Sequence, residues 1–409
     1  MARHRRRASG ALRSLVATAD RRRQGWGRLV TQRLDHLDGL RGVAAVAVVI
    51  FHLMSALTPW LVPEQQPGAH WLAYTPFAVL WNGTFAVSVF FILSGFVVTN
   101  ATLRKSDPIW IDVTIRYLRL AVPATASTLA AWLLLSAFPT SATELAALTG
   151  SRWLGWTYQG TIPGPAAAIY NGMAGIFLSG GSFFNNVLWT MRPELLGSIL
   201  CFAACAFARP RFRLAIAIGS AVIFIALRRY DYVCFPLGII LREAWKAGRL
   251  PSTLPILAML LGLLIGSQSG DAARLLGLDS LPEALKPERK GGLLYPIAAM
   301  LIVYGCLRSP WLIDALSGRI GRYLGAISFP LYLTHVSFIY TIVAEAYLRT
   351  SQHGLAFAFL LPASIVLMFA MAHAAERWLE RPFLGLLGQL RRWLRGLTIG
   401  RRDVRGASS

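Results

Sequence analysis

Long apolar stretches recur along most of the chain, and they constrain its fold more than any other feature. Ten can be drawn, roughly at residues 37–57, 80–100, 116–138, 185–208, 212–228, 231–244, 252–268, 293–308, 325–348 and 354–379. Most approach the ~20 residues that a helix needs to cross the hydrocarbon core of a bilayer. Because the chain is 55% apolar and only 15% charged, the pattern predicts an all-α, polytopic integral membrane protein with about ten transmembrane helices.

The distribution of basic residues tests this assignment of membrane spans, because lysine and arginine concentrate on the cytoplasmic side of membrane proteins. With the N-terminus inside and the segments alternating, 32 of the 41 lysines and arginines fall inside and 8 outside, while Arg192 lies within a segment. The asymmetry predicts that both termini are cytoplasmic. Membrane orientation then accounts for the net charge of +22, and we expect no nucleic-acid partner.

The chain divides into three parts on this reading. Residues 1–34 form a basic cytoplasmic tail that can rest on anionic lipid, residues 35–382 the transmembrane domain, and residues 383–409 an amphipathic helix with a second basic tail. The longest outer loop, 139–184, is nearly uncharged and rich in Gly, Ala, Pro and Trp. Such a loop either lies on the membrane or lines the mouth of a cavity. The four cysteines lie in apolar segments and indicate no metal site.

The first apolar segment, LDGLRGVAAVAVVIFHL, carries one cation and one imidazole. Arg41 and His52 are eleven residues apart, so on a helix both face the same way and lie ~16 Å apart along the axis. Arg41 alone is explained equally well as a cytoplasmic anchor, and His52 alone as a histidine bonded to a neighbouring helix. Together on one stripe they favour function, since ionisable groups inside a membrane are costly.

Three further segments hold polar groups. IRYLRLAVP puts Arg116 and Arg119 on one face, where they either anchor the helix or bind a cytoplasmic anion through their guanidinium forks. In WTMRPELLGS, Glu194 follows Arg192 and Pro193, and it either joins two helices as an ion pair or orients His52. His335, in ISFPLYLTH, is either catalytic or bonded to a backbone carbonyl.

FFILSGFVVT contains the pair Ser94-Gly95. Small residues of this kind most often allow helices to pack closely. The segment is not a G-x-S-x-G elbow, which disfavours a serine hydrolase.

Taken together, six motifs in this order resemble the acyltransferase type 3 family of membrane O-acyltransferases over residues 35 to about 383. They are LDGLRGVAAVAVVIFH, FFILSGFVVT, IRYLRLAVP, WTMRPELLGS, ISFPLYLTH and ERWLERPF. The resemblance implies transfer of an acyl group, usually acetyl, from coenzyme A to a hydroxyl of a carbohydrate or related compound. It also implies a multi-pass protein of the bacterial inner membrane. Many relatives append an extracytoplasmic hydrolase-like domain, which we do not expect in this chain.

By this resemblance, Arg41 and His52 match the family's functional pair. Arg116 and Arg119 match arginines linked to the donor, and Ser94 is expected with them at the donor site. Glu194 and His335 match further polar positions. The expected partners are acyl-CoA as co-substrate, a polysaccharide or other carbohydrate acceptor, membrane lipids and other proteins of envelope glycan assembly, with no metal.

The resulting hypothesis makes His52 the general base that takes a proton from the acceptor hydroxyl. Arg41, Arg116 and Arg119 would position the donor, and Glu194 or His335 would orient His52 or the acceptor. Four alternatives stay open at this stage. His52 could carry the acyl group transiently, the acceptor could be a secondary metabolite such as a macrolide, or the chain could be a transporter of an anionic solute or a non-catalytic scaffold.

Overall fold

The computed structural model describes residues 34–65, 69–105, 107–157, 161–207, 209–268, 280, 282, 292–350 and 354–406. Residues 36–409 form one compact unit, and residues 1–35 form another, of which only residues 34 and 35 are described. The expected basic tail, apart from Leu34, and the four basic residues counted at 274–290 therefore lie outside the described residues.

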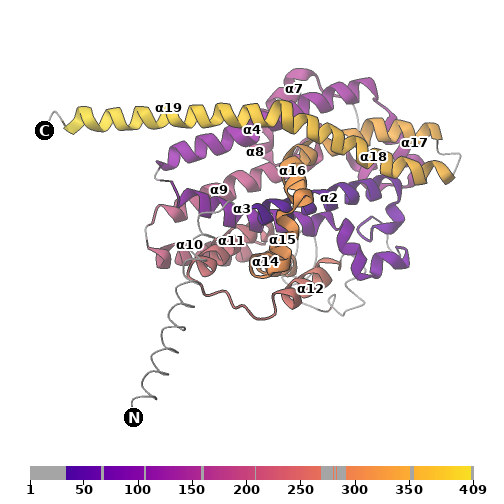
Figure 1. The fold of residues 1–409 in the computed structure, drawn as a ribbon. Coiled ribbons are helices and arrows are strands. Elements are labelled where there is room, and N and C mark those ends of the chain that lie inside the picture. Colours follow the sequence, from indigo (N-terminus) through magenta and orange to yellow (C-terminus); the bar gives the residue numbers. More distant parts are fainter. Residues whose placement is uncertain are drawn as a thin grey trace, which may run out of the picture. The chain divides into compact units, whose positions relative to one another are not determined.

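Every one of the ten apolar segments contains a helix, and the described residues include no β-strand (Figure 1). The ten helices are α2 (Asp35–Leu57), α3 (Gly83–Thr102), α4 (Ile109–Ala137), α9 (Met191–Cys205), α10 (Pro210–Ala226), α11 (Tyr230–Lys246), α12 (Pro255–Gly266), α14 (Leu294–Arg308), α16 (Arg319–Phe338) and α18 (Gly354–Ala375). The all-α prediction is thus confirmed for the described part of the chain.

Length and hydropathy separate these helices into two groups. Six helical stretches among the described residues are long and apolar enough to cross a bilayer, and they contain α2, α3, α4, α9, α16 and α18. A seventh results if α14 and α15 (Pro310–Ser317), which are bent by 89° at their junction, count as one span. Helices α10 and α11 have 17 residues each and α12 has 12. The chain is therefore treated as a multi-pass membrane protein, while the count of ten spans and the orientation stay predictions.

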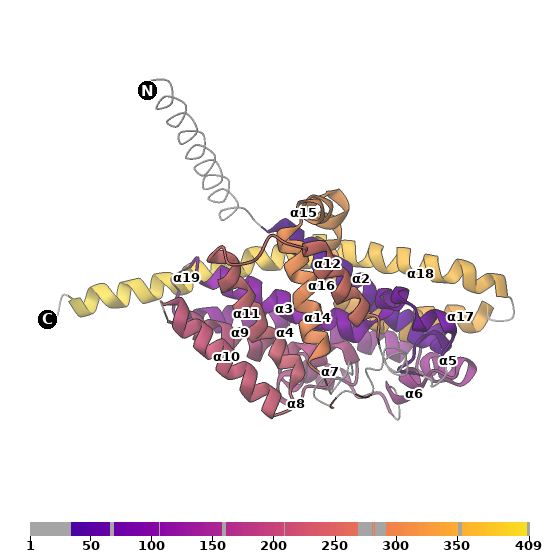
Figure 2. The same cartoon turned by 90° about the horizontal axis from the view of Figure 1, so that it is seen from below.

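Short helices fill the connections on either side of the long ones. Residues 58–82 form η1 (Pro59–Leu61), η2 (Trp71–Tyr74) and η3 (Pro76–Trp81). The uncharged segment 139–184 forms α5 (Ser141–Thr149), α6 (Arg152–Thr157), α7 (Pro165–Tyr170), η4 (Asn171–Gly175) and α8 (Ile176–Ser179), and η5 (Asn186–Thr190) leads into α9. Figure 2 shows α5 and α6 near α17 (Ala344–Thr350), which follows α16 through the π-helical turn η8 (Ile339–Val343). Segment 139–184 is therefore folded against the bundle.

The C-terminal helix continues from the last apolar segment without a break. A π-helical turn, η9 (Glu376–Glu380), joins α18 to α19 (Arg381–Gly406), so that residues 358–398 form one helical stretch (Figures 1 and 2). Arg391 and Arg395 form ion pairs with Asp107, just before α4, and Arg391 also pairs with Asp112. These arginines therefore face the start of α4, because the carboxylates of Asp107 and Asp112 attract them.

Helices α2 and α16 approach each other unusually closely at glycines. A Cβ atom on Gly42 would lie 2.4 Å from the carbonyl carbon of Leu324, and one on Gly325 would lie 2.7 Å from the carbonyl oxygen of Asp38. Only residues without a side chain permit such an approach, which is a common way to pack helices in membranes. The contact sets the register between the two helices that carry Arg41, His52 and His335.

Candidate active site

The sequence-predicted cations gather at one cavity. Its volume is about 230 Å³, and it lies among α2, α3, α4, η5–α9 and α16. Its polar lining comprises Asp38, Arg41, Ser94, Arg116, Arg119, Thr190, Glu194, Ser328 and Tyr332. Five of the seven predicted site residues thus line one space, which we call the arginine cavity. Because sites that enclose a whole drug-sized ligand measure roughly 300–1,000 Å³, this cavity matches part of a larger ligand.

Arg41 reaches across from α2 to α16. Its Nε donates to the hydroxyl of Ser328 at 3.1 Å, and one terminal nitrogen lies 3.2 Å from the carboxylate of Asp38. The same side chain approaches the carbonyl oxygen of Gly325 at 3.4 Å. Arg41 is therefore held at the α2–α16 contact by neighbours on both helices, which makes its position depend on the packing of Gly42.

Glu194 joins α9 to α3 and α4. Its carboxylate forms an ion pair with Arg116 and accepts a hydrogen bond from Ser94 at 2.7 Å, and Arg116 also donates to Ser94 at 3.2 Å. Among the alternatives left open by the sequence, the structure has Glu194 in the inter-helix ion pair. Ser94 belongs to the same network, so its short side chain is used for bonding as well as for packing.

Arg119 is the third arginine of the cavity, and it has no bonded partner among the described residues. The charges of Arg41 and Arg116 are matched by those of Asp38 and Glu194. Within the described part of the chain, Arg119 makes no hydrogen bond or close ion pair, and only longer-range electrostatic attraction reaches it, chiefly from Glu380. The arginine cavity therefore carries one guanidinium that is available to an anion.

His52 and His335 form a pair at a second location. The Nε2 atom of His335 lies 3.1 Å from Nδ1 of His52, and both rings are almost fully buried. Each Nδ1 also lies 2.9 Å from a carbonyl oxygen of its own helix, Leu331 for His335 and Val48 for His52. Helix α16 therefore supplies His52 with an imidazole partner, which is one of the alternatives that the sequence had left open for His335.

This geometry fixes the tautomers of the neutral pair. A carbonyl oxygen only accepts, so Nδ1 of His335 carries its hydrogen and Nε2 is left as an acceptor. Nδ1 of His52 faces two acceptors, Val48 and His335, and so it carries the hydrogen of that ring. The lone pair of His52 is consequently on Nε2, which is the state that a general base requires.

The histidine pair adjoins the arginine cavity but does not line it. Tyr332 belongs to both places, because it lines the cavity and its ring centroid lies 5.9 Å from that of His335. The hydroxyl of Tyr332 is bonded to Val187 and Thr190, each at 3.0 Å. A ligand that extends from Arg119 to His52 therefore has to pass Tyr332.

Segment 139–184 covers His52 on its other side. Trp153 of α6 packs against His52 with ring centroids 4.8 Å apart, and the ring centroid of Tyr340 of η8 lies 5.0 Å from that of Trp153. The backbone N–H of Trp153 donates to the side chain of Gln65 at 2.9 Å, which ties α6 to the segment after α2. His52 is thereby enclosed between an aromatic cover and the helix bundle.

Among the described residues, no group of three or more His, Cys, Asp or Glu side chains is arranged to hold a metal ion. A family model described as an acyltransferase domain, acyltransferase 3, matches residues 34–373. The chain belongs to this acyltransferase family.

Comparison with curated proteins supports the same assignment at lower similarity. The acyltransferase is 25% identical over 376 residues to a protein named O-acetyltransferase PaAT-1, from Phomopsis amygdali, covering 75% of this chain and 72% of that protein. No solved structure matches the chain significantly. The chain is thus an acyltransferase enzyme, and its site must be interpreted from its own geometry.

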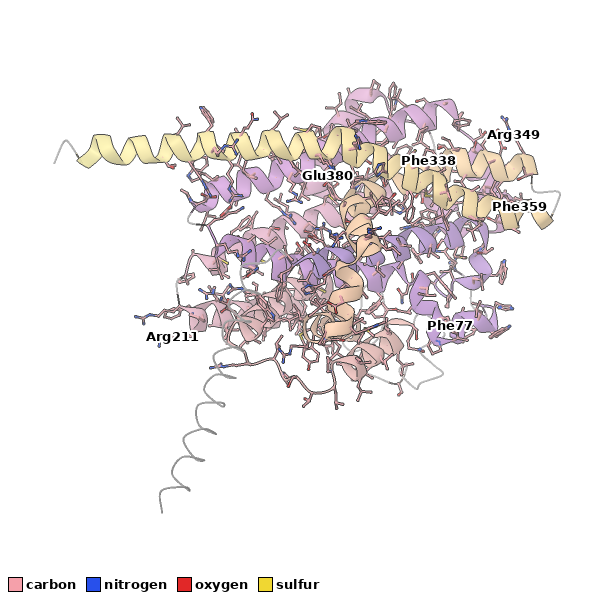
Figure 3. All side chains as sticks on the ribbon, in the orientation of Figure 1. Phe77, Arg211, Phe338, Arg349, Phe359 and Glu380 are labelled. Carbon is pink, nitrogen blue, oxygen red and sulfur yellow. The ribbon has the colours of Figure 1, made fainter. Side chains whose placement is uncertain are left out.

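Three residues near the acyltransferase site were missed by sequence reasoning. Trp153 and Tyr340 lie in segments without a recognisable motif, and only the tryptophan content of 139–184 pointed toward the cover. Glu380, in the ERWLERPF motif, lies where α18 passes into α19 (Figure 3), and its Oε2 atom is buried without a hydrogen-bond partner among the described residues. Its charge acts on Arg119 and Arg41, so the motif signalled a contribution to the arginine cavity.

Proposed function

We propose that this acyltransferase moves an acetyl group from cytoplasmic acetyl-CoA to a hydroxyl of a cell-envelope or exported polysaccharide, or of its precursor. The proposed location is the bacterial inner membrane, beside other proteins of envelope glycan assembly. One observation carries the proposal: a cavity whose Arg119 makes no hydrogen bond or close ion pair with any described residue adjoins, through Tyr332, a histidine pair in which Nδ1 of His52 carries the hydrogen and Nε2 the lone pair.

The proposed binding of the acyl donor is based on charge complementarity between coenzyme A and the arginine cavity. Coenzyme A carries several phosphate negative charges, and guanidinium groups bind phosphate through paired hydrogen bonds. Arg119 is open for such a contact, whereas Arg41 and Arg116 already have carboxylate partners. The nucleotide would stay at the cavity mouth, while the thin pantetheine arm would pass Tyr332 and bring the thioester to His52.

The transfer step follows from the tautomer of His52. Nε2 of His52 takes the proton from the acceptor hydroxyl as its oxygen attacks the thioester carbonyl. The new C–O bond forms, the C–S bond breaks, and the proton passes from His52 to the sulfur that leaves. The products are an acetyl ester and free coenzyme A. His335 acts as a positioning residue, because it accepts the hydrogen bond from Nδ1 of His52.

A transfer assay tests the proposal. Membranes that contain the full-length protein are incubated with acetyl-CoA labelled in the acetyl group and with a glycan extract of the cells that produce the protein. We expect the label in a carbohydrate ester, with release of one free thiol per ester. Label that appears only as unchanged solute inside vesicles would favour transport, and label trapped covalently on His52 would make this residue an acyl carrier.

A further inference from the structure

A buried hydroxyl lies one helical turn beyond His52, on the side away from Arg41. Ser55 of α2 is fully buried, and its Oγ makes no hydrogen bond to any described residue. Serines in helices usually bond to the carbonyl oxygen four residues earlier, and Ser198 and Thr125 do so in this protein. An unpaired hydroxyl inside a protein is costly, so its presence on the same stripe as His52 requires an explanation.

A second unpaired polar atom belongs to the same neighbourhood. The side-chain oxygen of Asn186, on η5, is buried without a hydrogen-bond partner within the described ranges. Asn186 lies at Tyr340, the ring of Tyr340 packs against that of Trp153, and Trp153 packs against His52. We call Ser55, Trp153, Asn186 and Tyr340 the Ser55 cluster. It offers one hydroxyl, one amide oxygen and the ring of Trp153, which packs against His52.

The cover over this cluster is attached to Ser55 itself. Ser151, which directly precedes α6, donates its hydroxyl to the carbonyl oxygen of Ser55 at 2.6 Å. Together with the bond from Trp153 to Gln65, this contact holds α6 over the end of α2. The backbone of Ser55 is therefore satisfied, and only its side chain remains without a partner.

We propose that the Ser55 cluster is the acceptor subsite, and that it selects an uncharged compound with several hydroxyl groups. This inference rests on the proposed function. Hydroxyls that flank the reacting one would pair with Ser55 and Asn186, while the apolar face of the acceptor would lie on Trp153. A simple alcohol would leave both atoms unpaired, and sites built for hydrogen bonding reject such ligands strongly. A charged acceptor would find only uncharged side chains in the cluster and would lose its hydration without compensation.

The chain offers a matched control for Ser55. Ser337 of α16 also has a buried hydroxyl without a hydrogen-bond partner among the described residues. It lines a separate apolar groove formed by α4, α16 and α18, and it is two residues from His335, so it projects to the opposite side of the helix. Ser55→Ala and Ser337→Ala therefore remove the same group from two sides of the bundle.

The test uses purified full-length protein, saturating labelled acetyl-CoA and three acceptors: decyl glucoside, decyl glucuronide and decan-1-ol. We expect transfer to the glucoside at least about tenfold faster than to the other two. Ser55→Ala should raise the KM for the glucoside about tenfold, as the loss of one or more hydrogen bonds does, with the KM for acetyl-CoA unchanged. Ser337→Ala should leave both constants unchanged. Equal transfer to decan-1-ol or to the glucuronide, or equal effects of the two variants, would overturn the proposal.

The melting temperature is a second measurement, and it distinguishes a binding role of Ser55 from a purely structural one. Removing an unpaired buried hydroxyl is neutral or stabilising, so Ser55→Ala should melt at or above the wild-type temperature. A lower melting temperature would assign Ser55 to the fold. If none of the three acceptors reacts, the ester formed from the cell extract decides: a neutral polyol supports the subsite, and a charged or simple alcohol overturns it. Absence of any His52-dependent ester would instead refute the proposed function on which the subsite rests.

Discussion

A single methyl group at Gly42 should disable the site without touching any polar residue in it. In Gly42→Ala the new Cβ would lie 2.4 Å from the carbonyl carbon of Leu324, whereas ordinary contact begins at 3.4 Å. All three atoms within 2.6 Å of the new Cβ are backbone or Cβ atoms, so α2 and α16 must separate by about 1 Å, the difference between 2.4 and 3.4 Å.

The separation has a calculable effect on catalysis. It stretches the bond from Arg41 to Ser328, now 3.1 Å, and the contact between His52 and His335, also 3.1 Å, beyond hydrogen-bonding distance. A displacement of ~1 Å at a catalytic group can cost about 100-fold in rate. We therefore expect kcat/KM for acetyl transfer to fall about 100-fold, or about 2.7 kcal/mol of transition-state stabilisation.

The assay is the initial rate of label transfer from limiting acetyl-CoA, normalised to the amount of folded protein. Gly219→Ala on α10 is the matched control, because a Cβ there meets nothing within 4 Å, and we expect wild-type activity from it. If Gly42→Ala is folded and keeps the wild-type kcat/KM, the close α2–α16 contact does not set the geometry of the site.

Three other predictions follow from the same geometry. Arg119→Ala should raise the KM for acetyl-CoA about tenfold or more, as expected for a lost charge-assisted bond, and leave the KM for the acceptor unchanged in the same assay. His335→Gln, which keeps a hydrogen-bond acceptor, should retain more of kcat than His335→Leu, and rates that rank the other way would refute the positioning role. Burial disfavours the charged form of Asp107, but hydrogen bonds from Arg395 and Arg391 outweigh it and lower the pKa of this carboxyl below its usual range. A carboxyl with a lowered folded-state pKa stabilises the fold above its unfolded pKa of about 3.9 and loses that contribution as the pH falls further. Thermal melts between pH 6 and pH 3 should therefore show an acid-dependent loss in the wild type that is smaller in Asp107→Asn.

Helical periodicity predicted which side chains of one helix share a face, and the family resemblance indicated which of these faces belong to one site. Arg116 and Arg119 lie three residues apart on α4, and both line the arginine cavity with Arg41. Ser94 and Glu194 line it as well. The charged residues among them could be identified from sequence because the cost of burying charge in an apolar segment marks each of them individually. Ser94 carries no such mark and was expected there only alongside the family's donor-linked arginines.

Partnerships across helices could not be predicted in the same way. Glycine contacts set the register between α2 and α16, and the pairing of His52 with His335 depends on this register. The sequence alone does not show which glycines make such contacts. Trp153 reaches His52 through a fold of segment 139–184 that no periodicity describes. The number of spans is also a matter of packing, because α12 is too short to cross a bilayer unaided.

The central claim is that His52 is the base in acetyl transfer, and single-turnover transfer by His52→Ala tests it most directly. Purified wild-type and variant protein are mixed with labelled acetyl-CoA and the glycan extract, and acetyl-CoA binding is measured in parallel. Loss of a general base typically costs 10²–10⁴-fold, so we expect a decrease of about that size with binding of acetyl-CoA retained. Transfer by a folded His52→Ala protein at the wild-type rate would contradict the account.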